Sequence, residues 1–200
     1  MTTKISALRG RPRSFDPDAA VDVAMRLFHA RGYDAVSVAE IGEALGIKPP
    51  SFYSAFGSKA GLFERVVERY GEAGERFAAE ALAGGGSVAD AIERLLRGIT
   101  RLYLQCDGVA GCLVIDSTRN SPDPEARAIT ARQGVAGRAM IRNAIAREFP
   151  DRAEALADDV VIAMKGLSAA ARDGASLETL ERFAMMVART FRRELESPAG

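Results

Sequence analysis

Residues 48–54 include four side chains that can hydrogen-bond to a polar partner. Phe52 lies within this segment, and Phe56 follows four residues later. Residues four apart lie on one face of a helix, so the pair predicts a buried side and leaves the polar groups on the opposite side. Such a face can bind the phosphates or base edges of a nucleic acid. The polar side chains are Lys48, Ser51, Tyr53 and Ser54.

Residues suited to catalysis or metal binding are scarce. His29 is the single histidine, and Cys106 and Cys112 are the two cysteines. Their spacing does not match a zinc site. A Ser-His-Asp set would have to use His29, whose place late in the first predicted helix favours an exposed or capping role. The Gly84–Gly86 run lacks the Lys-Ser/Thr of a phosphate-binding loop. We therefore expect no enzyme, no cofactor and no metal.

The composition is that of a globular domain. The 200 residues include 27 Lys and Arg, 27 Asp and Glu, and 48% hydrophobic residues. No apolar run reaches the ~18–20 residues that cross a bilayer, and the polar, basic start has no signal-peptide core. We expect a cytoplasmic protein without a disulfide scaffold.

Helix signals run along the whole chain, which predicts an all-α fold. Asp16 and Pro17 start a helix that Gly32 ends. Ser37 and Glu40 form a capping box for a second helix, which ends before Gly46. Further helices are predicted at 49–56, from Ser58 through Tyr70, at 87–106, 124–149, 151–174 and 176–196, with one or two turns at 112–117.

The two short helices around Gly46 form a helix-turn-helix pattern, although any small helical bundle contains short helix pairs. In a helix-turn-helix the second helix enters the DNA major groove. The run SVAEIGEALGIKPPSFYSAFGSKAGLF at 37–63, and MRLFHARGY before it, resemble the DNA-binding signature of the TetR/AcrR family of transcriptional repressors. The matching features are Ser37, Ile41, Gly46-Ile47, Phe52-Tyr53, Phe56, Lys59 and Leu62-Phe63.

The resemblance implies a two-fold dimer that binds a palindromic operator in double-stranded DNA and leaves it when a small-molecule inducer binds. It divides the chain into a basic arm (1–14), a helix-turn-helix DNA-binding domain (15–60) and a helical ligand-binding and dimerisation domain (61–200). Ser37 would cap the second helix and reach a phosphate, as would Lys59. Tyr53 would reach the backbone or a base edge. The groove would be lined by Lys48, Pro50, Ser51 and Ser54.

Two departures from the family pattern concern these contacts. Ala55 stands where the family often has His or Tyr, which puts one phosphate contact in doubt. Pro49 and Pro50 carry no side-chain donor, so they can meet thymine methyls but cannot pair with base edges. Specificity is therefore expected to rely on Lys48, Ser51, Ser54, DNA shape and the arm.

The arm carries four basic residues and no acidic one within residues 1–15. Arg9-Gly10-Arg11-Pro12 resembles the core of an AT-hook, which fits the narrow minor groove of A·T tracts. Arg9, Arg11 and Arg13 are therefore candidate DNA contacts, and a solvated tail is the alternative.

The C-terminal part offers candidate residues for a ligand pocket and a dimer interface. The two last helices are the expected dimer pair, with intrachain core as the alternative for each residue. The interface candidates are Ala163, Gly166, Leu167, Ala170, Phe183, Met186, Val187 and Phe191. The pocket candidates are Tyr103, Cys106, Cys112, Asp116, Arg119, Met140 and Met164.

Two other functions remain open at this point. Cys106 or Cys112 could make the protein a regulator that senses oxidants or electrophiles, which requires an exposed thiol with a lowered pKa. An architectural A·T-rich DNA binder that uses only the arm would leave the 37–63 motif unexplained. The operator, the inducer, the regulated genes and the choice between repression and activation are not encoded in any of these motifs.

Overall fold

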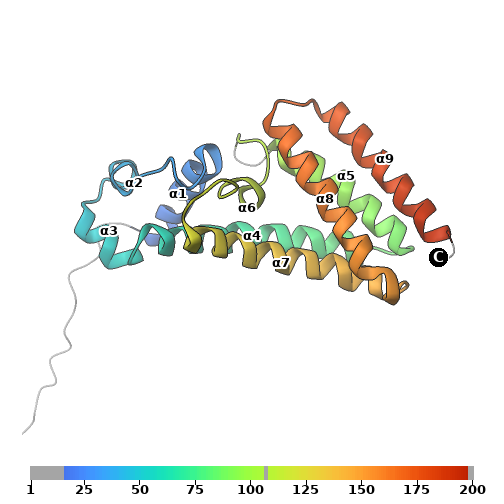
Figure 1. Ribbon diagram of the computed structural model, residues 1–200. Coiled ribbons are helices and arrows are strands. Elements are labelled where there is room, and N and C mark those ends of the chain that lie inside the picture. The colour runs from blue at the N-terminus through green and yellow to red at the C-terminus, as the bar shows by residue number, and fades with distance from the viewer. Residues whose placement is uncertain (1–15, 106–107, 198–200) are drawn as a thin grey trace, which may run out of the picture.

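The computed structural model describes residues 16–105 and 108–197, which form helices and loops without a strand. The fold is therefore all-α, as predicted, and Figure 1 shows its arrangement. The helices are α1 Pro17–Arg31, α2 Val38–Leu45, α3 Pro49–Phe56, α4 Lys59–Ala83, α5 Val88–Gln105, α6 Leu113–Asp116, α7 Pro124–Ala146, the 3-10 helix η1 Pro150–Arg152, α8 Ala153–Arg172 and α9 Leu177–Glu196.

The predicted helix boundaries in the first part of the chain are confirmed. Asp16 caps α1 by accepting from the Asp18 amide, and Ser58 caps α4 by accepting from the Gly61 amide. The capping box at the start of α2 has both of its hydrogen bonds. Gly46 ends α2 in the left-handed region at φ 65°, where glycine has no steric penalty.

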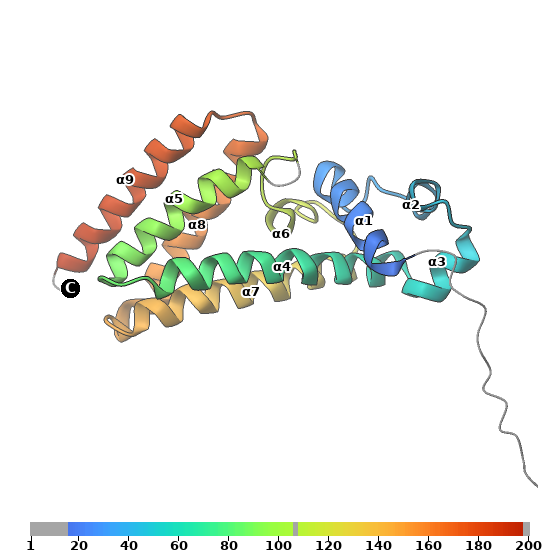
Figure 2. The same cartoon turned by 180° about the vertical axis from the view of Figure 1, so that it is seen from behind.

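The helices are arranged along a long α4–α7 pair. α4 and α7 lie side by side through the length of the molecule in both views, with α1–α3 at one end and α5, α8 and α9 toward the other (Figures 1 and 2). α6 sits between these two groups and contacts α1, α4, α7 and α8. The small α1–α3 unit is thus connected to the rest by α4 and by the α6 region.

The core around α1–α3 does not stop at residue 60. Phe28, Phe52 and Phe63 are fully buried in it, and α4 contributes as far as Val67. Leu113, Ala126 and Ile129, from α6 and α7, complete the same cluster. The division at residues 60 and 61 therefore stays a prediction, because one hydrophobic cluster extends across it.

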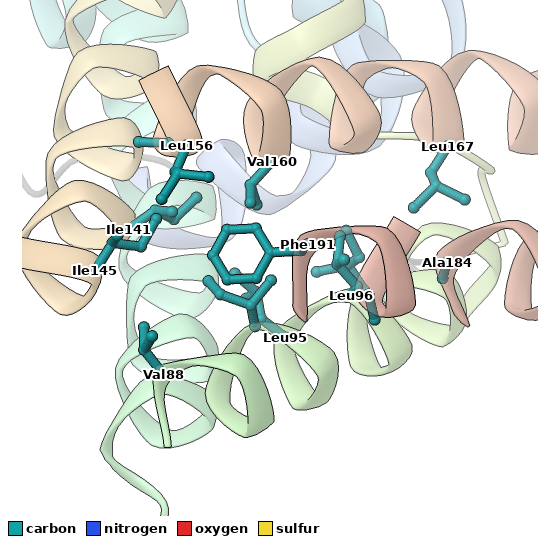
Figure 3. Packing of buried hydrophobic residues seen from close by; sticks show 14 of the residues in the cluster. Val88, Leu95, Leu96, Ile141, Ile145, Leu156, Val160, Leu167, Ala184 and Phe191 are labelled. Carbon is teal, nitrogen blue, oxygen red and sulfur yellow. The ribbon is translucent and has the colours of Figure 1, made fainter. Parts of the chain in front are cut away.

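The second core lies between α5, α7, α8 and α9. Figure 3 shows Leu95, Val160 and Phe191 packed against one another at its centre. Leu167 is 1% exposed and Phe191 is 5% exposed within the single chain. These two side chains therefore stabilise the chain's own fold, which corrects their prediction as interface residues.

The 112–117 stretch forms a single turn, α6, which agrees with the one or two turns expected. Two other local expectations are corrected. α7 ends at Ala146, and Pro150 begins η1 before α8, because proline fits the first turn of a helix. His29 is 2% exposed, with its Nε2 atom 3.2 Å from the Gly111 carbonyl oxygen. An exposed histidine was expected because a helix end is usually solvated, but α6 and its preceding loop cover this one.

Candidate nucleic-acid interface and interior cavity

The predicted recognition helix α3 has one buried and one exposed side. Phe52 and Phe56 are 0% and 6% exposed and pack with their ring centroids 5.3 Å apart. Tyr53, by contrast, is 52% exposed although it is aromatic. Lys48, Pro50 and Ser54 are also exposed, and Ser51 is partly exposed. Solvent therefore reaches all five residues that the sequence placed on the groove side.

Ser37 is engaged in the structure of its own helix end. Its Oγ atom accepts from the Glu40 amide at 3.2 Å and donates to Glu40 Oε2 at 2.9 Å. Glu40 in turn accepts from Arg31 Nη1 at 2.7 Å. The Ser37 amide and Arg31 lower the Glu40 pKa to about 2. This network fixes the start of α2 relative to the end of α1, and sequence analysis did not identify Arg31 as part of it.

Lys59 points toward the protein. Its Nζ atom donates to the Val36 carbonyl at 2.9 Å and lies 4.0 Å from the centroid of the Tyr33 ring. Burial lowers the Lys59 pKa, while Asp34 and Asp123 act in the opposite direction. The ammonium therefore holds the segment before α2 against α4 in this conformation. The arm residues Arg9, Arg11 and Arg13 lie outside the described residues.

The α1–α2 loop is hydrogen-bonded to the region around α6 and α7. The Tyr33 amide donates to the Ser117 carbonyl at 2.8 Å. The Tyr33 hydroxyl donates to Asp123 Oδ2 at 3.1 Å, and Asp123 also caps α7. Arg172, at the end of α8, donates to the His29 carbonyl at 3.1 Å. The helix-turn-helix unit thus has polar contacts to both α7 and α8 in addition to its continuity with α4.

An interior cavity of about 830 Å³ lies among α4, α5, α6, α7 and α8. Its volume is in the range of small-molecule sites. Four of the predicted pocket residues line it: Tyr103, Cys112, Met140 and Met164. Val135 and Ile162 also line it and are 68% and 65% exposed, which places its opening between α7 and α8.

Two further features of the cavity were not predicted from the sequence: a polar pair that spans it and glycines that make room for it. Gln133 Nε2, from α7, donates to Glu75 Oε1, from α4, at 2.7 Å. Gly71 and Gly74 of α4 and Gly134 and Gly137 of α7 line the cavity. Two glycines spaced by three in each of two predicted helices are a signal that the sequence does contain.

Asp116 and Arg119 line a different hollow, a crevice of about 530 Å³ between the α1–α2 loop, α6 and the end of α8. Asp116 accepts from Arg119 Nη2 at 3.0 Å and from Ser168 Oγ at 2.7 Å. Asp116 and Arg119 therefore line this crevice and not the interior cavity, which differs from the expectation that they share a pocket with Cys112. Cys106 lies outside the described residues.

The Cys112 thiol lacks the character of a reactive thiolate. Burial raises the Cys112 pKa, although backbone amides and the Tyr70 side chain act in the opposite direction. A protonated thiol is a weak nucleophile. The structure therefore does not favour oxidant or electrophile sensing at Cys112.

The outer faces of α8 and α9 carry exposed apolar side chains. Phe183 and Met186 are 40% and 47% exposed, and Gly166 is exposed as well. Ala170 and Val187 are partly buried, and Ala163 is 7% exposed. Ile162 and Leu177, which sequence analysis did not select, are exposed on the same two helices. Exposed apolar clusters of this kind mark interaction surfaces.

Two candidate site types are absent from the part of the chain that the structure describes. Residues 16–105 and 108–197 contain no group of three or more His, Cys, Asp or Glu side chains placed to hold a metal ion. No helix in those same ranges has the length and hydropathy needed to span a membrane.

Comparisons with known proteins identify the helix-turn-helix unit. The model of the family described as bacterial regulatory proteins, tetR family, matches residues 20–66. The chain is 42% identical over 196 residues to the HTH-type transcriptional repressor BdcR of Escherichia coli strain K12. The matched region covers 98% of this chain and 99% of that repressor. It is 36% identical to the repressor ComR of the same strain, with 92% of each chain covered.

A solved structure extends the similarity to three dimensions. A cysteine mutant of the TetR family regulator CifR, complexed with 26-bp double-strand operator DNA, superimposes with a TM-score of 0.78. The match has 32% sequence identity and covers 90% of this chain and 98% of that one. Similarity at this identity and coverage includes the C-terminal helices as well as the DNA-binding unit. The chain therefore belongs to the tetR family of bacterial regulatory proteins, and it is a DNA-binding transcription regulator rather than an enzyme.

Proposed function

We propose that this protein is a homodimeric repressor that binds a palindromic operator and releases it when a small molecule occupies the interior cavity. The observation that carries the proposal is the exposed polar side of α3, where Tyr53 is half exposed beside two buried phenylalanines. An exposed aromatic side chain buries little apolar surface and so contributes little to the stability of the fold. Contact with DNA accounts for the exposed position of Tyr53.

The proposed contacts divide by what each side chain can reach. Lys48, Ser51, Tyr53 and Ser54 bind base edges and phosphates in the major groove, and Pro50 supplies an apolar surface. Ser37 lies at the start of α2 and reaches a phosphate. Lys59 can reach a phosphate only if its ammonium breaks the hydrogen bond to the Val36 carbonyl. Its main proposed role is therefore to position the segment that carries Ser37. Arg9, Arg11 and Arg13 bind the adjacent minor groove.

The named functions of the relatives support repression rather than activation. BdcR and ComR are both named repressors, and the CifR structure contains operator DNA. The two alternatives are not favoured, since burial raises the pKa of the Cys112 thiol and the family match at residues 20–66 lies outside the arm. A repressor of this type acts where the chromosome is, so the proposal includes a cytoplasmic location.

The test is fluorescence-anisotropy titration of the full-length protein against DNA upstream of its own gene and a scrambled fragment. The wild type is expected to prefer the native fragment by about 10³-fold or more. Tyr53→Ala and Lys48→Ala are expected to weaken specific binding, and Lys48→Ala to lower the salt dependence. Arg76→Ala, which removes a positive charge from α4 far from the recognition helix, is the matched control and is expected to bind like wild type.

Two results would count against the proposal. Equal binding to both fragments that is indifferent to Tyr53→Ala would assign binding to the arm alone. A genome-wide selection that recovers only non-palindromic fragments would exclude a two-fold dimer on a palindromic site.

A further inference from the structure

The wall of the interior cavity is mostly apolar. Side chains such as Phe77, Ile99, Val114 and Ile141 line it together with Met140 and Met164. An apolar wall returns little of the hydration energy that a charged ligand would lose. Apolar ligand surface, in contrast, gains free energy in proportion to the area it buries.

Glycines widen the cavity between α4 and α7. A Cβ atom built on Gly74, Gly134 or Gly137 would meet no atom within 4 Å. Glycine inside a helix costs roughly 0.5–1 kcal/mol relative to alanine, and packing does not require glycine at these three positions. Gly134 is exposed, whereas Gly74 and Gly137 are partly buried and line the cavity. Alanine at these two positions would remove free space from the cavity, so they point to an occupant that needs that space.

Most of the charged and polar groups along the wall already have partners. Glu75 accepts from Gln133, and the hydroxyls of Thr118 and Thr130 lie 2.6 Å apart. Arg138, near the opening, donates to Asp158 at 2.6 Å. Lys165 also lines the cavity and forms no ion pair within residues 16–105 and 108–197, but it is exposed, so a charge paired with it stays in contact with solvent. Away from Lys165, a charged ligand would have to break one of these pairs to gain a counterion. The wall therefore favours an uncharged ligand.

Tyr103 differs from these groups. It is 3% exposed, it lines the cavity, and no hydrogen bond joins its hydroxyl to another described residue. Burial raises the Tyr103 pKa well above its usual value, with Cys112 and Asp116 adding to the shift. The hydroxyl therefore stays protonated and can donate. Among the described residues, only Ser117 Oγ is a fully enclosed side-chain polar atom without a partner, so the Tyr103 hydroxyl retains accessible surface. A ligand acceptor in the cavity can therefore bind a donor that no described residue uses.

We infer that the inducer is an uncharged, predominantly apolar molecule with a hydrogen-bond acceptor, such as a ketone or ester carbonyl, that accepts from the Tyr103 hydroxyl. This inference rests on the proposed function and specifies its ligand. The Gly74 and Gly137 surfaces of α4 and α7 hold the apolar body of the molecule. The opening between Val135 and Ile162 admits it.

The test compares three probes of similar shape by displacement of the fluorescent, uncharged N-phenyl-1-naphthylamine. The probes are 2-acetylnaphthalene, which has an acceptor, 2-ethylnaphthalene, which has none, and 2-naphthoate, which is charged. The wild type is expected to bind the ketone about 5–10-fold more tightly than the hydrocarbon, as one hydrogen bond provides. The carboxylate is expected to bind more weakly than the ketone.

Substitutions in the cavity wall test the Tyr103 hydroxyl and the free space beside the glycines separately. Tyr103→Phe removes only the hydroxyl and is expected to abolish the ketone's advantage while leaving the hydrocarbon unchanged. Gly74→Leu and Gly137→Leu fill the cavity and are expected to lose both probes. Gly85→Leu lies in the α4–α5 loop, where a Cβ also meets nothing within 4 Å, and it is expected to bind like wild type.

Operator binding is measured on the same preparations, which also reports whether each variant folds. A ketone advantage that survives Tyr103→Phe, tighter binding of 2-naphthoate, or no displacement by any probe from operator-competent protein would overturn the inference alone. Loss of specific operator binding by the wild type would instead overturn the proposed function. The two failures are therefore distinguishable.

Discussion

At the scale of single residues, the glycines of α4 have opposite roles along one helix. A Cβ on Gly61 would lie 2.3 Å from the backbone oxygen of Phe56, so glycine is required where α3 turns into α4. A Cβ on Gly74, more than three turns later, would project into open space. The same residue type thus permits a close backbone approach at one end of the helix and a cavity in its middle.

The two glycines give a matched pair of stability predictions. Gly61→Ala is expected to lower the free energy of unfolding by about 1–3 kcal/mol, because the clash is with backbone that must shift. Gly74→Ala is expected to raise it by about 0.4–1 kcal/mol, because alanine restricts the unfolded chain without a new clash. Urea unfolding of both variants measures the difference. A Gly74→Ala variant less stable than Gly61→Ala would show that the cavity assignment is wrong.

At the scale of elements, polar links between helices fix how the bundle is assembled. Asp90 accepts from the Ser87 amide at the start of α5 and from Arg192 of α9 at 2.8 Å. α5 and α9 pack along their lengths around Leu96 and Ala184 (Figure 3). The ion pair therefore closes one end of an interface whose middle is apolar.

This ion pair predicts an acid-dependent loss of stability. Arg192, followed by Ser87, lowers the Asp90 pKa to about 2 from its usual 3.8. A carboxyl whose folded pKa is depressed stabilises the fold above its unfolded pKa, and the contribution disappears as pH falls through the folded value. Asp90→Asn is expected to show a shallower fall in melting temperature between about pH 4 and pH 2 than wild type.

The control for the acid experiment is Asp151→Asn, which removes an exposed carboxylate that forms no ion pair within residues 16–105 and 108–197. Its melting temperature is expected to fall as steeply as that of wild type. Because Glu40 is also titrated in this range, some slope remains in every variant. Identical slopes for Asp90→Asn and wild type would contradict the prediction.

The arm is an element whose effect is expected in the salt dependence of DNA binding. Deleting residues 1–13, or replacing Arg9, Arg11 and Arg13 by Gln, is expected to reduce the slope of log K against log salt by about 0.9 for each phosphate that the arm neutralises. Anisotropy titrations at several salt concentrations measure the slope. An unchanged slope would mean that the arm is a solvated tail.

At the scale of the whole molecule, operator binding depends on how two copies join. The exposed apolar side chains of α9 include Phe183 and Met186, and α9 lies away from the α1–α3 end in Figure 1. A dimer formed there would place two recognition helices at separate positions on the DNA. Half-sites about one helical turn apart, or a multiple of it, match such an arrangement.

The exposed apolar side chains of α9 predict that charged substitutions there will prevent dimerisation. Phe183→Glu combined with Met186→Glu is expected to produce monomers in analytical ultracentrifugation and to weaken operator binding by about 10²-fold or more, because the second half-site is no longer held in place. Ala79→Glu, on the exposed side of α4, adds a similar charge elsewhere and is expected to remain dimeric. A double variant that stays dimeric would place the interface on another face.

Local signals in the sequence predicted the helix-turn-helix unit almost residue by residue. Ser37, Glu40, Gly46 and Pro49 act through neighbours within four positions, so their effect does not depend on distant contacts. Phe52 and Phe56 lie on the buried side because a helix has one periodicity. The same local chemistry carries the family resemblance, which is why the exposed side of α3 could be predicted from the sequence.

Residues without such local signals were placed only by the tertiary structure. His29, Asp116, Leu167 and Phe191 each looked suitable for a surface or pocket, and long-range packing buried or redirected them. The inward direction of Lys59 depends on Val36 and Tyr33, which are more than twenty residues away. The helices and the family could be predicted without the tertiary structure, because caps and periodicity are local. The cavity and the links to α1 were decided by the tertiary structure, since they exist only where distant helices meet.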